Sequence, residues 1–324
     1  MTIKDISQPV ENHLIEFNNY FKNSMKSNVS LLNLIIRYMT RKRGKQVRPT
    51  MVFLSAMLCG GINQRSYVGA ALVELLHTAT LIHDDVVDQS DKRRGIATIN
   101  AEWNNKIAVL IGDYLLGKGL LAAIDKDEFQ FLKATSEAVR RMSEGELLQI
   151  QKSREINIDE ETYFKIISDK TASLISTCCE IGAISATDDR EKQLVMKEYG
   201  ELVGIAFQIR DDIFDYTGKS STIGKPIGND LKEKKITLPL LYSFSKVDKS
   251  KVKELVKIIK SDKLQNKNIN EIVDFVKSNG GIEYSEKIAM EYAENAIKKL
   301  EIFDDSIAKN SLINFAKFVI ERNK

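Results

Sequence analysis

Apolar residues recur at three- and four-residue intervals along most of the chain, which is the spacing of one face of an α-helix. The pattern predicts helices over residues 51–60, 67–88, 104–124, 129–151, 163–186 and 190–216. Several of these segments are apolar around most of their circumference, and such helices lie inside a bundle with neighbours on every side. From Lys246 onward the pattern is amphipathic and richer in lysine, which predicts outer helices. The predicted fold class is all-α.

Composition supports a single large helical domain. The 324 residues are 43% hydrophobic and include only 4 prolines and 17 glycines, so the chain can bury a sizeable core and has few helix breakers. No Pro/Gly/Ser-rich linker, low-complexity tract or internal repeat divides it. We therefore expect one domain over residues 1–324.

Charge and cysteine usage exclude several classes of protein. The formal net charge of +3 comes from 48 basic and 45 acidic residues without a basic stripe, which argues against nucleic acid as a partner. Cys59, Cys178 and Cys179 lack metal-binding spacing, as expected of a reduced, cytoplasmic protein. The charged N-terminus does not resemble a signal peptide, and no uncharged apolar run reaches about 18 residues. We expect any membrane contact to be peripheral.

The stretch HDDVVDQSDKRRG, residues 83–95, places three aspartates behind an apolar segment and basic residues directly after them. In a helix Asp84 and Asp88 project from one face a single turn apart, and Asp85 lies about 100° round the axis. These carboxylates repel one another and oppose the helix dipole at that end. Taken alone, such a run is also explained by a solvated helix end. A divalent cation would relieve both penalties.

The second half of the chain repeats this constellation in FQIRDDIFDY, residues 207–216. Asp211, Asp212 and Asp215 have the same i, i+1, i+4 spacing and again follow an apolar segment, which disfavours the explanation by a solvated helix end. Carboxylate oxygens suit Mg²⁺, which keeps several waters and binds through a few carboxylates together with substrate phosphates. The absence of a Cys/His cage argues against zinc. The sequence therefore predicts Mg²⁺ as the cofactor.

Basic residues near these clusters are candidates for binding phosphate oxygens. They are Lys45, Arg48, His77, Arg93, Arg94, Lys170, Lys225, Lys232, Lys234 and Lys235. Each taken singly is also explained as an ordinary surface charge, or in the case of His77 as a hydrogen-bonded core histidine. Their arrangement favours phosphate binding, because Lys45 and Arg48 are three residues apart and His77 lies two turns before Asp84.

Five motifs, in this order, resemble those of the trans-polyprenyl diphosphate synthase family, which includes farnesyl and octaprenyl diphosphate synthases. The motifs are GKQVRP, HDDVVDQSDKRRG, DKTASL, FQIRDDIFDY and GKPIGNDLKEKKITLP. The resemblance covers nearly the whole chain. One departure lies in the last motif, where the family usually has glycine before the lysine and this chain has Lys234 before Lys235.

The resemblance implies an isoprenoid-synthase fold with a deep central cavity. It also implies a 1'-4 condensation of isopentenyl diphosphate with an allylic diphosphate. The candidate residues agree with this chemistry, because cleavage of the allylic C–O bond leaves a diphosphate with extra negative charge that Mg²⁺ and basic side chains stabilise. No protein nucleophile is required, since the departing diphosphate itself can take the final proton.

The resemblance also implies roles for individual residues. The implied metal ligands are Asp84, Asp88 and Asp211 most directly, with Asp85, Asp212 and Asp215 as direct or water-mediated ligands. The residues implied for the allylic diphosphate are Arg93, Lys170, Lys225 and Lys235, and those for isopentenyl diphosphate are Lys45, Arg48, His77 and Arg94. The residues implied beside the reacting carbons are Thr171 and Gln208. The catalytic set is then Asp84, Asp85, Asp88, Lys170, Thr171, Gln208, Asp211 and Asp212.

The small residues Ala79 and Thr80 lie about one turn before Asp84, where shorter-chain relatives tend to place bulky aromatic side chains. An extended isoprene unit is about as long as one helical turn, about 5.4 Å, so each turn of depth admits about one unit. We therefore expect a long product, of about six to eight isoprene units. Small residues that merely allow close helix packing are the competing explanation. A quinone side chain is the expected use of the product, and the resemblance suggests a homodimer.

Other functions fit the sequence less well. The alternatives are a farnesyl or geranylgeranyl diphosphate synthase, a terpenoid cyclase and a non-catalytic subunit of a heteromeric synthase. A cyclase needs no second substrate site and would have little use for Lys45, Arg48 and Arg94. A non-catalytic subunit would be expected to lose aspartates, whereas both clusters are intact.

Overall fold

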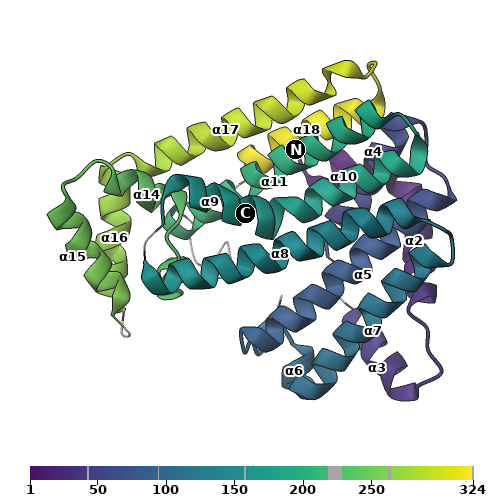
Figure 1. The fold of residues 1–324 in the computed structure, drawn as a ribbon, viewed down its shortest axis with the longest axis horizontal. Helices are drawn as coiled ribbons and strands as arrows, with labels where there is room; N and C mark the ends of the chain where they lie inside the picture. Colours follow the sequence, from purple (N-terminus) through teal and green to yellow (C-terminus); the bar gives the residue numbers. More distant parts are fainter. Residues whose placement is uncertain (42–43, 94, 157, 218–227, 262–263, 323–324) are drawn as a thin grey trace. The chain divides into compact units, whose positions relative to one another are not determined.

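The computed structural model describes residues 1–324 except 42–43, 94, 157, 218–227, 262–263 and 323–324, and helices dominate it (Figure 1). The first elements are α1 (Ile3–Ser7), η1 (Gln8–Val10), α2 (Glu11–Ser24), α3 (Ser30–Met39), α4 (Val47–Cys59), α5 (Gln64–Val87), β1 (Lys92–Arg93), β2 (Ile96–Ala97), α6 (Ile99–Glu102) and α7 (Asn105–Ile124). The next are α8 (Phe129–Glu155), α9 (Glu160–Ile167), η2 (Ser168–Ala172), α10 (Ser173–Ala186) and α11 (Arg190–Thr217). The last are α13 (Asn229–Lys232), α14 (Leu238–Phe244), α15 (Lys249–Lys260), α16 (Asn266–Ser278), α17 (Gly281–Lys299), η3 (Leu300–Ile302) and α18 (Ile307–Glu321).

The all-α prediction is confirmed, and the six helical segments predicted from periodicity all lie on observed helices. Two details differ from it. A short antiparallel hairpin, β1 with β2, pairs Lys92 with Ala97 directly after the first aspartate cluster. The segment predicted as one helix over 163–186 contains a single π-helical turn, η2, between α9 and α10.

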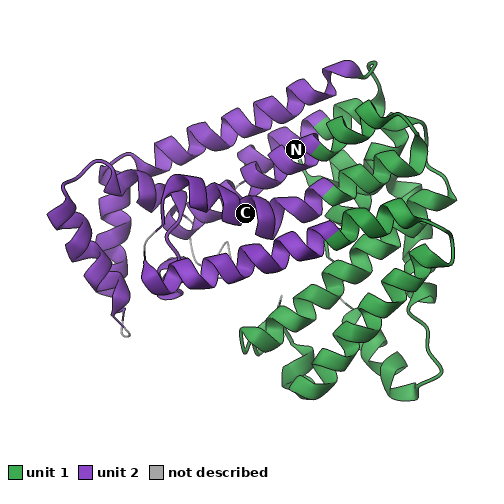
Figure 2. Ribbon diagram, viewed as in Figure 1, with its two compact units in different colours: residues 1–136, 177–197, 303–312 green, residues 137–176, 198–302, 313–324 purple. Residues whose placement is uncertain are grey.

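The described chain divides into two compact units (Figure 2). Unit 1 comprises residues 1–136, 177–197 and 303–312, and unit 2 comprises residues 137–176, 198–302 and 313–324. Because α8, α10, α11 and α18 each contribute residues to both units, most of the boundary falls within helices and not in linkers. A single domain over residues 1–324 stays a prediction.

The core of unit 1 forms around α5, which packs along α7 and against α4. Asn63 caps α5, because its side-chain oxygen accepts hydrogen bonds from the backbone N–H groups of Arg65 and Ser66. Buried apolar side chains from α3, α5, α6 and α7 form one cluster, which includes Leu75 and Ala79. This packing fixes the helix that ends in the first aspartate cluster.

The core of unit 2 gathers apolar side chains from α9, α11, α14, α15, α16 and α17. Tyr163 and Tyr216 are buried within it, and Ile209 and Ile213 contribute the inner face of α11. The second aspartate cluster lies on this same stretch of α11. Burial of the apolar face therefore determines which way its aspartates point.

Helix α7 keeps an apolar face exposed. Val109, Leu110, Leu120 and Leu121 are each more than 40% accessible. In the part of the chain that the structure describes, α7 is the one helix long and apolar enough to cross a membrane by length and composition. Core helices of soluble proteins meet the same criterion, and large apolar side chains exposed along one helix are candidates for a contact site.

Candidate active site

The first aspartate cluster lies where α5 ends. The helix ends at Val87, and Asp88 is its C-cap residue. Asp84 and Asp88 are exposed, whereas Asp85 is only 5% accessible. Two of the three carboxyl groups therefore face solvent at the negative end of the helix dipole.

The β1–β2 hairpin supplies a partner for Asp85. Arg93 on β1 donates a hydrogen bond from Nε to Asp85 Oδ1 at 2.8 Å. Burial raises the pKa of Asp85 above its ordinary value; Arg93 opposes this shift, and the charge of Asp88 adds to it. Arg93 thus compensates a carboxyl group of the cluster, and its role in binding the allylic diphosphate stays a prediction.

The other sequence-predicted residues of unit 1 lie on α4, on α5 and just before α4. Lys45 is exposed and precedes α4, while Arg48 is half-buried in the first turn of that helix. Gln46, between them, has a left-handed backbone with φ 51°, so Lys45 does not share a helical turn with Arg48. His77 is half-buried on α5, on the helix that carries Asp84. Arg94 and Lys225 lie outside the described residues.

Ala79 and Thr80 occupy different environments on α5. Ala79 is fully buried in the apolar cluster of unit 1, to which Leu75, Ala108 and Leu115 also belong. Thr80 is half-buried, and its hydroxyl donates to the backbone carbonyl of His77 at 2.9 Å. The surroundings of Ala79 are therefore apolar, as both the chain-length hypothesis and the packing explanation require.

In the second cluster, Asp211 is paired with an arginine from the C-terminal helix. Arg322 follows α18 directly and donates to Asp211 Oδ1 at 2.6 Å and to the backbone carbonyl of Phe207 at 2.9 Å. Its guanidinium group also lies 3.8 Å from the centroid of the Phe207 ring. Burial lowers the pKa of Arg322, and the charge of Asp211 opposes this shift. These contacts fix the direction of the Asp211 carboxylate.

Asp212 points into the protein and has a partner on each oxygen. Gln208 donates from Nε2 to Oδ1 at 2.8 Å, and the buried Tyr163 hydroxyl donates to Oδ2 at 2.7 Å. Burial raises the pKa of Asp212 well above its ordinary value and the charge of Asp230 raises it further, while the two hydrogen bonds lower it. Asp212 is thus an oriented, largely desolvated carboxyl group.

Asp215 anchors the segment that begins α13. Its two oxygens accept hydrogen bonds from the backbone N–H groups of Asn229, at 2.9 Å, and Asp230, at 3.2 Å. Burial and the charge of Asp230 raise the pKa of Asp215 to about 6, against the effect of these two hydrogen bonds. Asp215 therefore ties the loop bearing the last lysines to α11.

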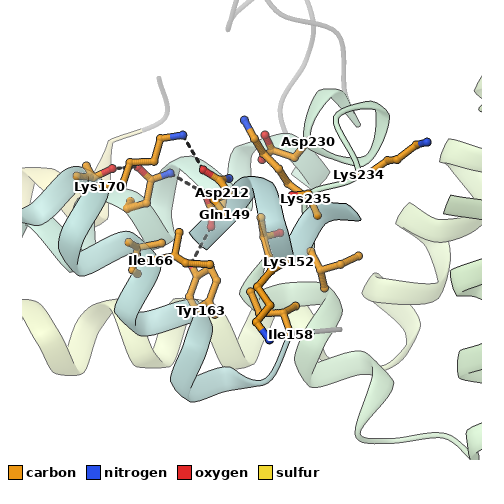
Figure 3. Close-up of a pocket in the computed structure, with 16 residues that line it drawn as sticks. Gln149, Lys152, Ile158, Tyr163, Ile166, Lys170, Asp212, Asp230, Lys234 and Lys235 are labelled. Carbon is orange, nitrogen blue, oxygen red and sulfur yellow. Dashed lines mark hydrogen bonds between the residues drawn. The ribbon is translucent and has the colours of Figure 1, made fainter. Parts of the chain in front are cut away.

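A pocket of about 100 Å³ in unit 2 brings six of the predicted residues together (Figure 3). These residues are Lys170, Thr171, Gln208, Asp212, Lys234 and Lys235. The Thr171 hydroxyl donates to Gln208 Oε1 at 2.8 Å, and Lys170 Nζ donates to Gln149 Oε1 at 2.6 Å and also pairs with Glu146. Asp211 and Asp215 do not line this pocket.

The closing lysines also line the pocket, and the departure at Lys234 has a structural counterpart. Lys234 has a left-handed backbone with φ 59°, a conformation that glycine adopts most easily. The turn is closed by a hydrogen bond from the Lys235 N–H to the Asp230 carbonyl at 2.8 Å. Lys235 pairs with Glu233, which raises its pKa although burial opposes this. The turn is therefore kept with lysine in place of glycine.

Sequence reasoning missed several residues of this site. They are Gln149, Lys152, Tyr163, Asp230 and Arg322. Gln149 and Lys152 look like ordinary polar positions of an amphipathic helix, and Tyr163 looks like a core aromatic. Asp230 lies in the motif GKPIGNDLKEKKITLP, and its negative charge beside the candidate lysines was the signal that could have identified it.

The residues present fit Mg²⁺ only as a cation shared with a phosphate ligand. Over the described ranges, no group of three or more His, Cys, Asp or Glu side chains is placed to hold a metal ion. The available donors are the carboxylate oxygens of the aspartates, and the side chains of Asp84 and Asp88 are exposed. Mg²⁺ needs only one or two carboxylates when substrate phosphates and waters complete its octahedron. The donor set does not fit a cage made by protein alone.

Comparison with known proteins decides the family. The family model described as "Polyprenyl synthetase" matches residues 29–276. The chain belongs to the polyprenyl synthetase family. The family prediction is thereby confirmed, and with it the assignment as a metal-dependent prenyltransferase of isoprenoid biosynthesis.

Curated relatives include both long-chain and shorter-chain synthases. An all-trans-nonaprenyl-diphosphate synthase (geranyl-diphosphate specific) of Rhodobacter capsulatus is 35% identical over 320 residues, 98% of each chain. The octaprenyl diphosphate synthase of Escherichia coli (strain K12) is 32% identical over 324 residues, 100% of each chain. A geranylgeranyl diphosphate synthase of Saccharolobus solfataricus is also 32% identical, over 335 residues and 100% of each chain.

Solved structures confirm the isoprenoid-synthase fold. A polyprenyl synthase from Caulobacter crescentus CB15, complexed with calcium and isoprenyl diphosphate, matches with a TM-score of 0.91 and 30% identity. The match covers 100% of this chain and 98% of that one. That relative therefore binds a divalent cation and a diphosphate on the same fold.

The Tyr163 hydroxyl should stabilise the ionised form of Asp212. We expect Tyr163→Phe to lower the free energy of unfolding by about 1–3 kcal/mol, because a buried carboxyl oxygen loses its donor. In the wild-type protein the hydrogen bond from Tyr163 lowers the pKa of Asp212 and so favours its carboxylate. Losing this bond should therefore cost more stability at about pH 8 than at about pH 5. Denaturant unfolding at both pH values measures this difference.

Tyr284→Phe is the matched control. The Tyr284 hydroxyl donates to Glu160 at 2.7 Å, but Glu160 is only half-buried and water can replace the donor. We expect this variant to lose less than about 1 kcal/mol. Equal losses in the two variants would contradict a special role for the Tyr163–Asp212 hydrogen bond.

Proposed function

We propose that this prenyltransferase makes a long-chain all-trans polyprenyl diphosphate, of about six to eight isoprene units by the helical-pitch estimate. It does so by repeated 1'-4 condensation of isopentenyl diphosphate onto an allylic diphosphate, with Mg²⁺ as cofactor, in the cytoplasm. The supporting observation is the pocket in which lysines and an oriented Thr171–Gln208–Asp212 chain lie together. The expected use is a quinone side chain.

In this proposal the aspartates of the two clusters have two different roles. Asp84 and Asp88 of the first cluster and Asp211 of the second bind Mg²⁺ directly, while Asp85, Asp212 and Asp215 orient the site or act through water. Bound Mg²⁺ supplies positive charge to the leaving diphosphate. Asp212 and Asp215 suit the supporting role, because protein donors already occupy both carboxylate oxygens of each, and Asp85 suits it because its side chain is buried.

Basic side chains provide the remaining charge for the two diphosphates. The residues proposed for the allylic diphosphate are Arg93, Lys170, Lys225 and Lys235, and those for isopentenyl diphosphate are Lys45, Arg48, His77 and Arg94. Lys170 and Lys235 line the same pocket, so charge on a diphosphate oxygen there is stabilised from two sides. In Figure 3 the Lys234 side chain extends away from Lys170, which favours Lys235 for this role.

Thr171 and Gln208 suit the stabilisation of an allylic cation. The hydrogen bond from Thr171 to Gln208 and that from Gln208 to Asp212 fix the orientation of the Gln208 amide. Oxygen dipoles that are already oriented need no reorganisation when positive charge develops. A site lined also by Ile166 and Ile167 limits the access of water to the cation.

Removal of a proposed metal ligand should abolish turnover without unfolding the protein. We expect wild-type protein to consume farnesyl diphosphate and isopentenyl diphosphate in the presence of Mg²⁺. Asp84→Ala and Asp211→Ala should each lower kcat by roughly a thousandfold or more, because each removes transition-state charge stabilisation worth several kcal/mol. Product assays with circular dichroism as a fold check measure both effects.

Asp274→Ala, at an exposed position of α16, is the control and should retain full activity. Near-full turnover of either cluster variant at saturating Mg²⁺ would refute the metal assignment. A wild-type protein that consumes neither substrate would instead favour the alternative of a non-catalytic subunit.

Product length is proposed from Ala79 and Thr80. Ala79 lies in an apolar environment on the helix that ends in the first cluster, where a growing chain could extend past a small side chain. The long-chain relatives are consistent with this proposal. The alternative is a short-chain farnesyl or geranylgeranyl product, which the geranylgeranyl relative at 32% identity keeps open.

A ring introduced at position 79 should shorten the product. We expect Ala79→Phe to stop elongation after about three or four units, because each helical turn of about 5.4 Å corresponds to about one isoprene unit. The first condensation should remain nearly as fast, since the aspartates are unchanged. Chain-length analysis of the extracted products measures this outcome.

Thr78→Phe places the same ring about 100° round the helix and should leave product length unchanged. A stable Ala79→Phe variant that still makes the full-length product would show that Ala79 does not face the chain. In that case close helix packing explains its small size.

We also propose a homodimer in which α7 of one protomer covers α7 of another, because a soluble monomer rarely keeps so apolar a helix exposed. Release of a long product would add a peripheral membrane contact. Leu121→Lys, at a position 53% exposed on α7, should shift the protein toward monomer, whereas Leu147→Lys, 66% exposed on α8, should not. Sedimentation equilibrium measures both, and a monomeric wild-type protein would rule the dimer out.

A further inference from the structure

The π-helical turn η2 carries two of the pocket residues. It spans Ser168–Ala172, between α9 and α10, and both Lys170 and Thr171 line the pocket. A π turn inserts an extra residue into a helix and changes the direction of the side chains around it, and such turns are frequent at functional sites. What holds η2 in place therefore determines where Lys170 and Thr171 point.

Two neighbouring helices approach the backbone of η2 through glycines. A Cβ atom on Gly145 of α8 would lie 3.0 Å from the Lys170 backbone nitrogen. A Cβ atom on Gly204 of α11 would lie 2.5 Å from the Ala172 Cα atom. The absence of side chains lets α8 and α11 pack directly on the turn, so small rotations of η2 are resisted by backbone contact.

Arg141 of α8 adds a polar clamp on the same turn. Its Nε donates to Asp169 Oδ1 at 2.7 Å, and its terminal nitrogens donate to Ser168 Oγ at 2.8 Å and to Glu201 at 2.6 and 3.1 Å. The Arg141 side chain is only 20% exposed. A forked contact of this kind constrains both distance and direction, which a lysine cannot reproduce.

Asp169 is the point at which the turn is tied to its surroundings. Its second carboxylate oxygen accepts a hydrogen bond from Lys165 of α9 at 2.9 Å, and its carbonyl accepts one from the Ser173 hydroxyl of α10 at 2.6 Å. The residue is buried and does not line the pocket. Asp169 therefore acts on the turn that it belongs to and not on a ligand.

We propose that Arg141, clamped between Asp169 and Glu201, is a positioning residue that holds η2 so that Lys170 and Thr171 face the pocket. The proposal rests on the proposed function, in which these two side chains act on the allylic diphosphate and the reacting carbons. Arg141 does not line the pocket, and its hydrogen bonds go to Asp169, Ser168 and Glu201, which do not line it either. Its effect on the reaction must therefore pass through η2.

The chain offers a matched pair of variants for testing this role. Arg140, the preceding residue, is exposed and pairs with Glu137 and Glu144 on its own helix. We expect Arg141→Met to lower kcat about 10- to 100-fold, the range for a misplacement of about 1 Å, with little change in KM for isopentenyl diphosphate. Arg140→Met should leave both constants unchanged.

A double-mutant cycle separates positioning from general destabilisation. In a Lys170→Met background, Arg141→Met should cause a much smaller further drop in kcat, because the group that it positions is gone. The same fold-drop in both backgrounds would overturn the proposal. The proposal would also be overturned if Arg141→Met lowered the melting temperature but the folded molecules kept the wild-type kcat.

Hydrogen exchange supplies a readout that does not depend on activity. Amides of residues 165–173 should exchange faster in Arg141→Met than in Arg140→Met, and unchanged exchange would overturn the proposal. If Arg141→Met does not fold, Glu201→Gln weakens the same clamp and is expected to give a smaller effect in the same direction. A wild-type protein without prenyltransferase activity would refute the proposed function, whereas the exchange experiment would still decide whether Arg141 holds η2.

Discussion

Negative charge gathered at the ends of two apolar helices is the constraint on which the rest of the site depends. The first cluster ends α5, and the second lies in the last two turns of α11. Carboxylates at a helix C-terminus oppose the dipole, and burial adds a desolvation cost to the ionised form. In each unit an arginine from a different element compensates one of them, Arg93 for Asp85 and Arg322 for Asp211.

Within each cluster, protein donors compensate some aspartates more than others. This difference separates the proposed roles of the aspartates. Asp85 and Asp212 are buried and accept hydrogen bonds from protein donors, whereas Asp84 and Asp88 are exposed. A buried carboxylate that protein donors hold is oriented but has less capacity for a cation than a carboxylate on an exposed side chain. Chemistry that proceeds by charge stabilisation needs both kinds.

The sequence predicted what depends on local spacing. Helical periodicity located the long helices, and the i, i+1, i+4 spacing correctly placed both aspartate clusters at helix ends, because both patterns arise within a few turns. The partners of those aspartates could not be predicted in this way. Arg322 is 111 residues from Asp211, and Tyr163 is 49 residues from Asp212, so only the tertiary fold brings them together. The β1–β2 hairpin escaped prediction because two-residue strands carry no periodic signal.

Local backbone preference is overridden at several places in the described chain, and two of them, both in unit 2, border the pocket. One is the π turn η2, and the other is Lys234, which has a positive φ that a lysine adopts only at a cost. Tertiary contacts hold each of them: glycine packing and Arg141 at η2, and the Asp215-anchored loop at Lys234. Departures from local consistency that persist only because their surroundings enforce them are characteristic of functional positions. These two departures therefore border the pocket that Asp212, Lys170 and Lys235 also line.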